Sequence, residues 1–200
     1  RRKLIKILQV RNVDSFVDSR RQKTSQKDRK IVQSILEDVR KNGDSAVKKY
    51  ELKFNGKKTT QLRLTKQETK QAKISIEEFN ALKFSAVKLS KQQRNLKKSI
   101  VKSVKKLPNV SFTPIPSVGC YIPGGQARYP SSAIMSIITA AEAGVKRIVV
   151  VSPPDSNGKI DPMTITVAQN CGAEIYKTGG AQAIAALAYG TKSIPKVDKI

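Results

Sequence analysis

The sequence predicts an α/β fold, in which a mostly helical first half precedes a parallel, doubly wound sheet. Residues 118–190 alternate three times between a short apolar run and a helix-forming stretch, with short connections. The run VVV at 149–151 is typical of a strand buried on both faces. Prolines at 108, 114 and 116 disfavour helix and predict an extended linker between the two halves.

Residues 1–107 are predicted to be mostly helical. Ile31, Ile35 and Val39 recur at helical spacing, and Gly43 interrupts that rhythm. Asp44 is then the expected N-cap of the next helix. The segment TTQLRLT, residues 59–65, is the one strand expected in this half.

Two capping boxes are expected, formed by Thr65 with Glu68 and by Ser75 with Glu78. The second box predicts a helix that begins near residue 76 and runs toward Val104. The apolar residues of one face of that helix are Phe79, Leu82, Ala86 and Leu89.

The second half divides into alternating strands and helices. Its expected strands are 118–122, 146–154 and 174–180, and its expected helices are 131–144, 161–172 and 181–190. Asp161 is the expected N-cap of the middle helix, with Pro162 at its first position. Ser131 and Ser132 are interpreted as caps of the first helix rather than as nucleophiles, since no base lies within local reach.

The net charge of +24 is concentrated in the first half of the chain. Of 39 Lys and Arg and 15 Asp and Glu, 31 basic and 10 acidic residues precede Pro108, a net of +21. Two interpretations remain: a lysine-rich solvated helical surface, or a nucleic-acid-binding module with an α/β body. The scarcity of interleaved aromatic residues favours the solvated surface.

Several classes of site are excluded by composition. The chain contains no histidine, so it supplies no histidine base and no histidine-liganded metal. No apolar run of about 18 residues is present, which argues against a membrane span. Cys120 and Cys171 lie far apart in apolar contexts, as expected for reduced thiols, and the predicted compartment is the cytoplasm.

The candidate ligand residues follow the predicted strands, because ligands of open parallel sheets bind beyond the strands' carboxyl ends. Gly-Gly pairs follow the first and third strands, but neither G-x-G-x-x-G nor the P-loop pattern is present. Each Gly-Gly pair either allows close packing at a strand-to-helix turn or forms a turn in which the backbone contacts a ligand. Tyr121 is either a core aromatic or a ring-packing contact, Gln182 a local cap or a hydrogen-bonding contact, and Arg128 a candidate for a phosphate.

The motifs resemble one family when taken together. Residues 118–154 contain V-G-C-Y-I-P-G-G, A-G-V-K-R-I and S-P-P, and residues 179–190 read GGAQAIAALAYG. In this order and spacing they closely resemble histidinol dehydrogenase, and residues 35–56 look like that family's early helical segment.

The resemblance implies an enzyme that oxidises L-histidinol through histidinal to L-histidine with two NAD molecules. It implies a zinc ion that holds the substrate, a Glu-His pair as acid and base, and a homodimer. The implied fold has two incomplete Rossmann-like domains, the first split around the second, an aldehyde-dehydrogenase-like architecture. Residues 1–118 would form the helical tail and part of the first domain, and 119–200 the NAD-contacting domain. An aldehyde-dehydrogenase-like fold with another substrate is the alternative within this class.

The family's cofactor contacts map onto named positions of this chain. The tyrosine of Y-x-P-G-G corresponds to Tyr121 and the glutamine of G-G-A-Q to Gln182, while Pro123 would help to form the turn beside the cofactor. The family's zinc ligands and Glu-His pair correspond to positions beyond residue 200. The expectation is therefore an N-terminal piece of the enzyme that contains no catalytic or metal-ligating residue and is inactive alone.

Overall fold

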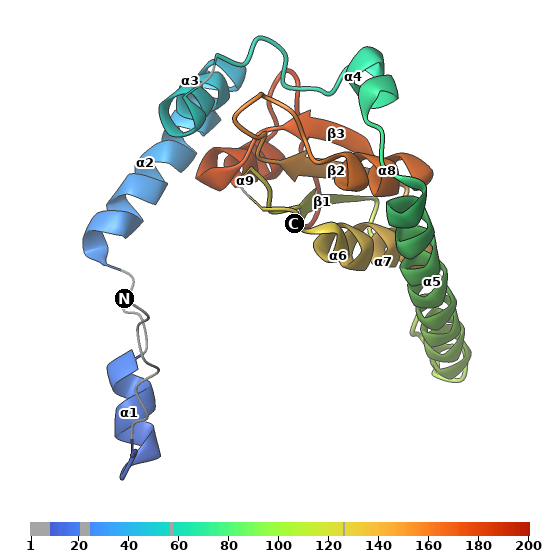
Figure 1. Cartoon of the computed structure of the whole chain (residues 1–200). Coiled ribbons are helices and arrows are strands. Elements are labelled where there is room, and N and C mark those ends of the chain that lie inside the picture. The colour runs from blue at the N-terminus through green and yellow to red at the C-terminus, as the bar shows by residue number, and fades with distance from the viewer. Residues whose placement is uncertain (1–8, 21–24, 57, 126) are drawn as a thin grey trace.

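A computed structural model describes residues 9–20, 25–56, 58–125 and 127–200 of the chain, and it confirms an α/β architecture (Figure 1). The strands are β1 (Ser117–Tyr121), β2 (Arg147–Ser152) and β3 (Glu174–Lys177). The helices are α1 (Val13–Arg20), α2 (Gln26–Asn42), α3 (Asp44–Asn55), α4 (Lys66–Gln71), α5 (Ile76–Val104), α6 (Pro130–Ala133), α7 (Thr139–Ala143), α8 (Pro162–Asn170) and α9 (Gly180–Tyr189). A π-helical turn, η1 (Ile134–Ile138), joins α6 to α7.

The sheet is parallel and has the order β1-β2-β3. On the edge of β1 away from β2, Val118 forms a parallel bridge with Lys199, and the Gly119 N–H donates to the Lys199 carbonyl at 2.8 Å. The chain thus leaves β1, builds outward through β2 and β3, and returns to the other side of β1.

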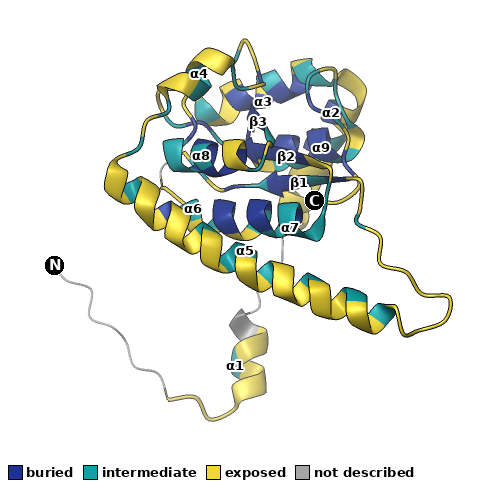
Figure 2. Ribbon diagram, turned by 90° about the vertical axis from the view of Figure 1, so that its right-hand side faces the viewer, coloured by how far each residue is buried: buried dark blue, intermediate teal, exposed yellow. Residues whose placement is uncertain are grey.

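Alternate residues of the strands supply two cores, one on each face of the sheet. Val149 and Val151 face the layer formed by α2, α3 and α9. Ile148 and Val150 face the layer formed by α6, η1, α7 and α8, with α5 packed outside it. Figure 2 shows the burial concentrated along the sheet and the helices that flank it, while α5 is mostly exposed.

The local helix signals of the first half are confirmed at three places. Both predicted capping boxes are present, and they begin α4 and α5. Gly43 ends α2, as the interrupted rhythm predicted. The assignment of Asp44 as an N-cap was wrong: Gly43 is the cap, and the Asp44 carboxylate instead accepts hydrogen bonds from the backbone and hydroxyl of Ser193.

Two further expectations need correction. Tyr129 is the N-cap of α6, so Ser131 and Ser132 lie inside that helix, where Pro130 already provides the φ angle of its first position. The predicted strand at 59–65 is reduced to one antiparallel bridge between Arg63 and Tyr176. Leu62 is nevertheless buried, and its carbonyl oxygen accepts a hydrogen bond of 2.7 Å from the backbone N–H of Lys177. The segment therefore covers the outer edge of β3.

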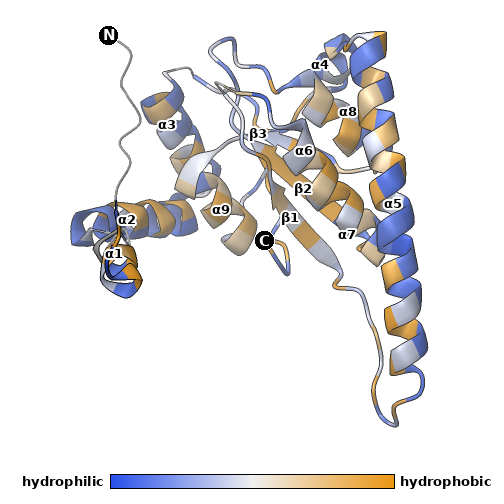
Figure 3. Ribbon diagram, turned by 60° about the horizontal axis from the view of Figure 1, so that its bottom comes forward, coloured by the Kyte–Doolittle hydropathy of each residue, from blue (hydrophilic) through white to orange (hydrophobic). Residues whose placement is uncertain are grey.

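Helix α5 confirms the predicted span, although only part of its apolar face is covered. Leu82 is buried, and Ala86 and Leu89 pack beside it, whereas Phe79 is 43% exposed. The C-terminal part of α5 extends past the sheet layers, and residues 105–116 return from it as an extended arm (Figure 3). Within the described residues, none of the helices combines the length and apolar composition that a membrane span needs.

Both cysteines are free thiols, as expected. Cys120 is buried in β1, and that burial raises the pKa of its thiol to about 11. The thiol therefore stays protonated near neutral pH and serves as a core group rather than as a nucleophile.

Candidate functional site

The helix arrangement identifies the candidate ligand-binding edge of the sheet. The connections after β1 and β2 run through helices on one face, whereas α9, which follows β3, lies on the other face and leads back to β1. The winding direction thus reverses at β1. Ligands of open α/β sheets bind beyond the carboxyl ends of the strands at such a switch point.

Tyr121 is the last residue of β1 and lies at this switch point. It is half-buried, and its hydroxyl oxygen accepts a hydrogen bond of 3.1 Å from the N–H of Gly180, the first residue of α9. The contact joins the carboxyl end of β1 to the N-terminus of a helix, which is the helix end that favours anions.

The two Gly-Gly turns meet at the loop that follows β2. A Cβ on Gly179 would lie 2.4 Å from Cγ of Pro153, and a Cβ on Gly124 would lie 2.9 Å from the Pro153 carbonyl oxygen. The second glycine of each pair, Gly125 or Gly180, has a positive φ of 89° or 61°. Each pair thus contains one glycine for close packing and one for a left-handed turn, and the three loops form one contiguous edge.

Gln182 lies beneath this edge, in the first turn of α9, with only 1% of its surface exposed. Its Nε2 donates to Oε1 of Glu51 at 2.8 Å. Its own Oε1 has no hydrogen-bond partner, the one such buried side-chain atom in the part of the chain that the structure describes. A buried acceptor without a partner is costly, so it marks a place where a donor is missing.

Glu51 is the site residue that the sequence reasoning missed. It is fully buried, and its Oε1 accepts from the hydroxyl of Thr178 at 2.7 Å and from the N–H of Gly179 at 2.9 Å, besides Gln182. One signal was present in the sequence: Glu51 lies four residues after Val47, on the apolar face of α3.

The other predicted candidates are placed differently. Pro123 is exposed at the start of the β1–α6 loop, directly after the buried Ile122. Arg128 pairs with Glu78 at 2.7 Å and with Asp161 at 2.6 Å, so two carboxylates already compensate its charge. The side chains of Arg128, Glu78 and Asp161 border a cavity of about 480 Å³. The cavity lies between α4, the start of α5, and the β1–α6 and β2–α8 loops.

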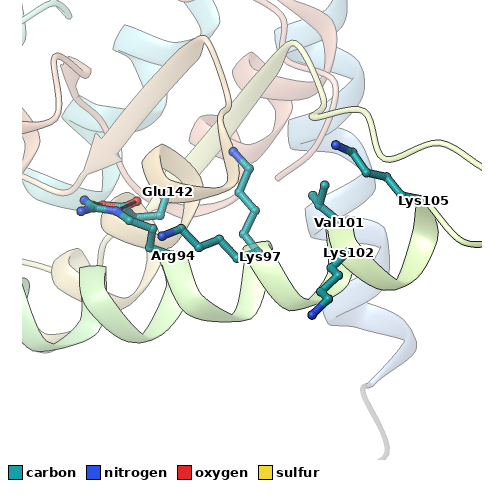
Figure 4. Close-up of a pocket in the computed structure, with 7 residues that line it drawn as sticks. Arg94, Lys97, Val101, Lys102, Lys105 and Glu142 are labelled. Atoms are coloured by element: carbon teal, nitrogen blue, oxygen red, sulfur yellow. Dashed lines mark hydrogen bonds and ion pairs between the residues drawn. The ribbon is translucent and has the colours of Figure 1, made fainter.

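A second hollow lies elsewhere, along the C-terminal half of α5 (Figure 4). Arg94 pairs there with Glu142 at 2.9 Å, and this hydrogen bond lowers the pKa of the Glu142 carboxyl. The remaining lining residues are Lys97, Lys98, Val101, Lys102 and Lys105. Glu142 precedes β2 in the chain, so this basic hollow lies toward the amino edge of the sheet, away from Tyr121.

The described residues do not fit a zinc site. No group of three or more Cys, Asp or Glu side chains gathers in a way that could hold a metal ion within those residues. The chain has no histidine, which removes the ligand that zinc commonly takes with carboxylates.

The fold places this chain in the class of doubly wound α/β proteins, whose ligands bind at a switch point of the sheet. A family model described as histidinol dehydrogenase matches residues 18–200. The chain belongs to the histidinol dehydrogenase family. The alternative of a nucleic-acid-binding protein is not supported.

Individual relatives agree. The chain is 46% identical over 175 residues to a histidinol dehydrogenase of Dehalococcoides mccartyi strain CBDB1, covering 86% of this chain and 40% of that protein. It is 40% identical over 182 residues to the protein of the same name from Geobacillus kaustophilus strain HTA426, covering 88% and 43%. The crystal structure of histidinol dehydrogenase from Elizabethkingia anophelis superposes with a TM-score of 0.74 at 32% identity, covering 86% of this chain and 41% of that one. The chain thus spans about 40% of the length of the curated relatives it matches.

Proposed function

We propose that this chain contributes part of the NAD site of an oxidoreductase that converts L-histidinol through histidinal to L-histidine, in histidine biosynthesis. The observation that carries the proposal is the hydrogen bond between Tyr121 and the N-terminus of α9 at the switch point. Membership of the histidinol dehydrogenase family supports the choice of reaction.

The edge offers complementary contacts to a dinucleotide. The Tyr121 ring would pack on a planar group, with the Pro123 ring beside it. The first turn of α9 has no side-chain cap, so the N–H groups of Ala181 and Gln182 would face phosphate oxygens. The unpartnered Oε1 of Gln182 would accept from a hydroxyl or amide group. NAD, when bound, supplies the hydride acceptor for the oxidation.

The remaining parts of the enzyme are proposed to come from outside these 200 residues. They are the zinc ligands that would hold L-histidinol and the Glu-His pair that would move protons. We also propose the division into residues 1–118 and 119–200, the homodimer and a cytoplasmic location for the complete enzyme.

The cofactor role is tested by replacing Tyr121 in the full gene product. Tyr121→Ala should raise the KM for NAD about tenfold or more, because it removes both the ring and the bond to Gly180. Tyr121→Phe keeps the ring and should raise that KM less. The KM for histidinol should change little in both variants, as steady-state kinetics would measure.

The matched control is Tyr189→Ala, since Tyr189 is an exposed tyrosine at the opposite end of α9. Its KM for NAD should equal that of the parent. An unchanged NAD requirement in Tyr121→Ala would overturn the cofactor role.

A further inference from the structure

The buried carboxylate of Glu51 links two distant parts of the chain. Glu51 belongs to α3, whereas the three donors on its Oε1 belong to Thr178, Gly179 and Gln182. Its other oxygen accepts from Nδ2 of Asn55 at 2.5 Å. A buried carboxylate is tolerated when hydrogen bonds replace its hydration, and here four donors supply them.

The chemistry of a carboxylate decides the orientation of Gln182. Both oxygens of Glu51 accept hydrogen bonds from protein donors, so the Gln182 amide presents its NH₂ group to Glu51. The amide oxygen is thereby turned away from Glu51 and left without a partner. This oxygen lies next to the backbone of exposed Gly180, where a Cβ would be 2.8 Å from it.

The same carboxylate also orients the turn between β3 and α9. It accepts a hydrogen bond from the N–H of Gly179, while the next N–H along the chain, that of Gly180, donates to the hydroxyl of Tyr121. One buried side chain from the helical half therefore holds the segment that contacts Tyr121 and contains Gln182.

We propose that Glu51 is a positioning residue of the cofactor site. It fixes the 178–182 turn against Tyr121 and fixes the Gln182 amide with its oxygen away from Glu51 and next to Gly180, as an acceptor for a hydroxyl or amide N–H of the cofactor rather than for a phosphate. The inference rests on the proposed NAD function of this edge.

The test compares two variants of Glu51 in the full gene product. Glu51→Met has a similar size but no acceptor, so it should raise the KM for NAD about tenfold or more and leave the KM for histidinol nearly unchanged. Glu51→Gln keeps an acceptor oxygen for all three donors, with its NH₂ group toward Asn55, whose amide turns over to present Oδ1 as the acceptor. This conservative variant should recover most of the affinity for NAD.

Direct binding and stability separate positioning from general damage. The dissociation constant for NAD, measured by calorimetry, should follow the KM in both variants. Asn55→Ala removes the contact to the other oxygen of Glu51, so it should lower the urea midpoint of unfolding and leave the affinity for NAD at the parent value. If Glu51→Met does not fold, Thr178→Val removes one of the three donors and should raise the dissociation constant for NAD severalfold.

A double variant tests whether Glu51 acts through Gln182. Because both changes would break the same contact, Glu51→Met with Gln182→Met should bind NAD no more weakly than the weaker single variant. Additive losses, or a parent-like affinity in Glu51→Met, would overturn the positioning role. Failure of the parent itself to bind NAD would instead overturn the proposed function.

Discussion

At the scale of single residues, Gly179 and Gly56 show two different reasons for a glycine. The Cβ of an alanine at Gly179 would meet Cγ of Pro153 at 2.4 Å and its Cα at 3.2 Å, so the obstruction includes backbone. Gly56 ends α3 with a φ of 69°, and no atom lies within 4 Å of its Cβ position. The first glycine is required by space, and the second by backbone conformation.

We therefore expect Gly179→Ala to destabilise the protein by about 2 to 3 kcal/mol, because the β2–α8 loop must shift to admit the methyl group. Gly56→Ala should cost only about 1 kcal/mol, the strain of a left-handed alanine. Urea unfolding of the two variants measures the difference. Equal losses of stability in the two variants would contradict this expectation, because they would mean that the loop at Pro153 shifts at little cost in free energy.

The site residues differ in how far the sequence alone predicts them. Tyr121 and Gln182 are placed at the carboxyl edge by the strand pattern, and the structure brings both to the same turn. Glu51 escapes prediction because a glutamate on a helix is usually solvated. Its role depends on donors more than 120 residues away, which no local pattern contains.

At the scale of elements, helices were predicted well where their ends are determined locally. A capping box satisfies backbone donors within four residues, so the starts of α4 and α5 can be read from the sequence. The segment 59–65 was predicted less well. Whether it forms a strand depends on how many of its residues pair with the edge of β3, and it forms only one bridge there.

The cap of α5 gives a prediction at this scale. In Ser75→Ala the N–H of Glu78 loses its acceptor, so the protein should lose about 1 kcal/mol of stability. Ser85→Ala is the matched control, since Ser85 is exposed within the same helix and alanine has the higher helix propensity. Thermal or urea unfolding should show a loss for the first variant and none for the second.

At the scale of the whole molecule, the lysines of α5 carry part of the excess charge on the solvent side of the fold. The lysines of α5 are mostly exposed, and Lys97 alone approaches the body closely, with its Nζ 2.9 Å from the Cβ position of Gly144. That glycine ends α7, where a cation stabilises the helix dipole. The solvated helical surface expected from the lysine spacing is consistent with this exposure.

Two carboxylates of the helical half, those of Glu68 and Asp44, bond to residues of the second half, so the stability of the fold should depend on pH. Burial acts to raise the pKa of Glu68, but hydrogen bonds from Lys177 and Thr65 outweigh it and hold the pKa below its usual value. The same balance, with hydrogen bonds from Ser193 and Thr191, lowers the pKa of Asp44. Both groups bind protons more weakly in the folded state than in the unfolded state.

A lowered folded-state pKa contributes stability above the unfolded pKa, near 4, and that contribution is lost as the pH falls through the folded value. The urea midpoint should therefore hold between about pH 7 and pH 5 and fall below about pH 4. In Glu68→Gln the midpoint should be lower at pH 7, and the gap to the parent should narrow below pH 4. A constant gap across this range would contradict the linkage.

The buried bonds of Glu51 have a consequence during synthesis. Their partners follow Glu51 by 127, 128 and 131 residues. At typical elongation rates, a nascent chain would wait about 6 to 26 s between the emergence of the carboxylate and that of its donors. Through that interval the Glu51 carboxylate stays hydrated, and α3 lacks its contacts with residues 178–182.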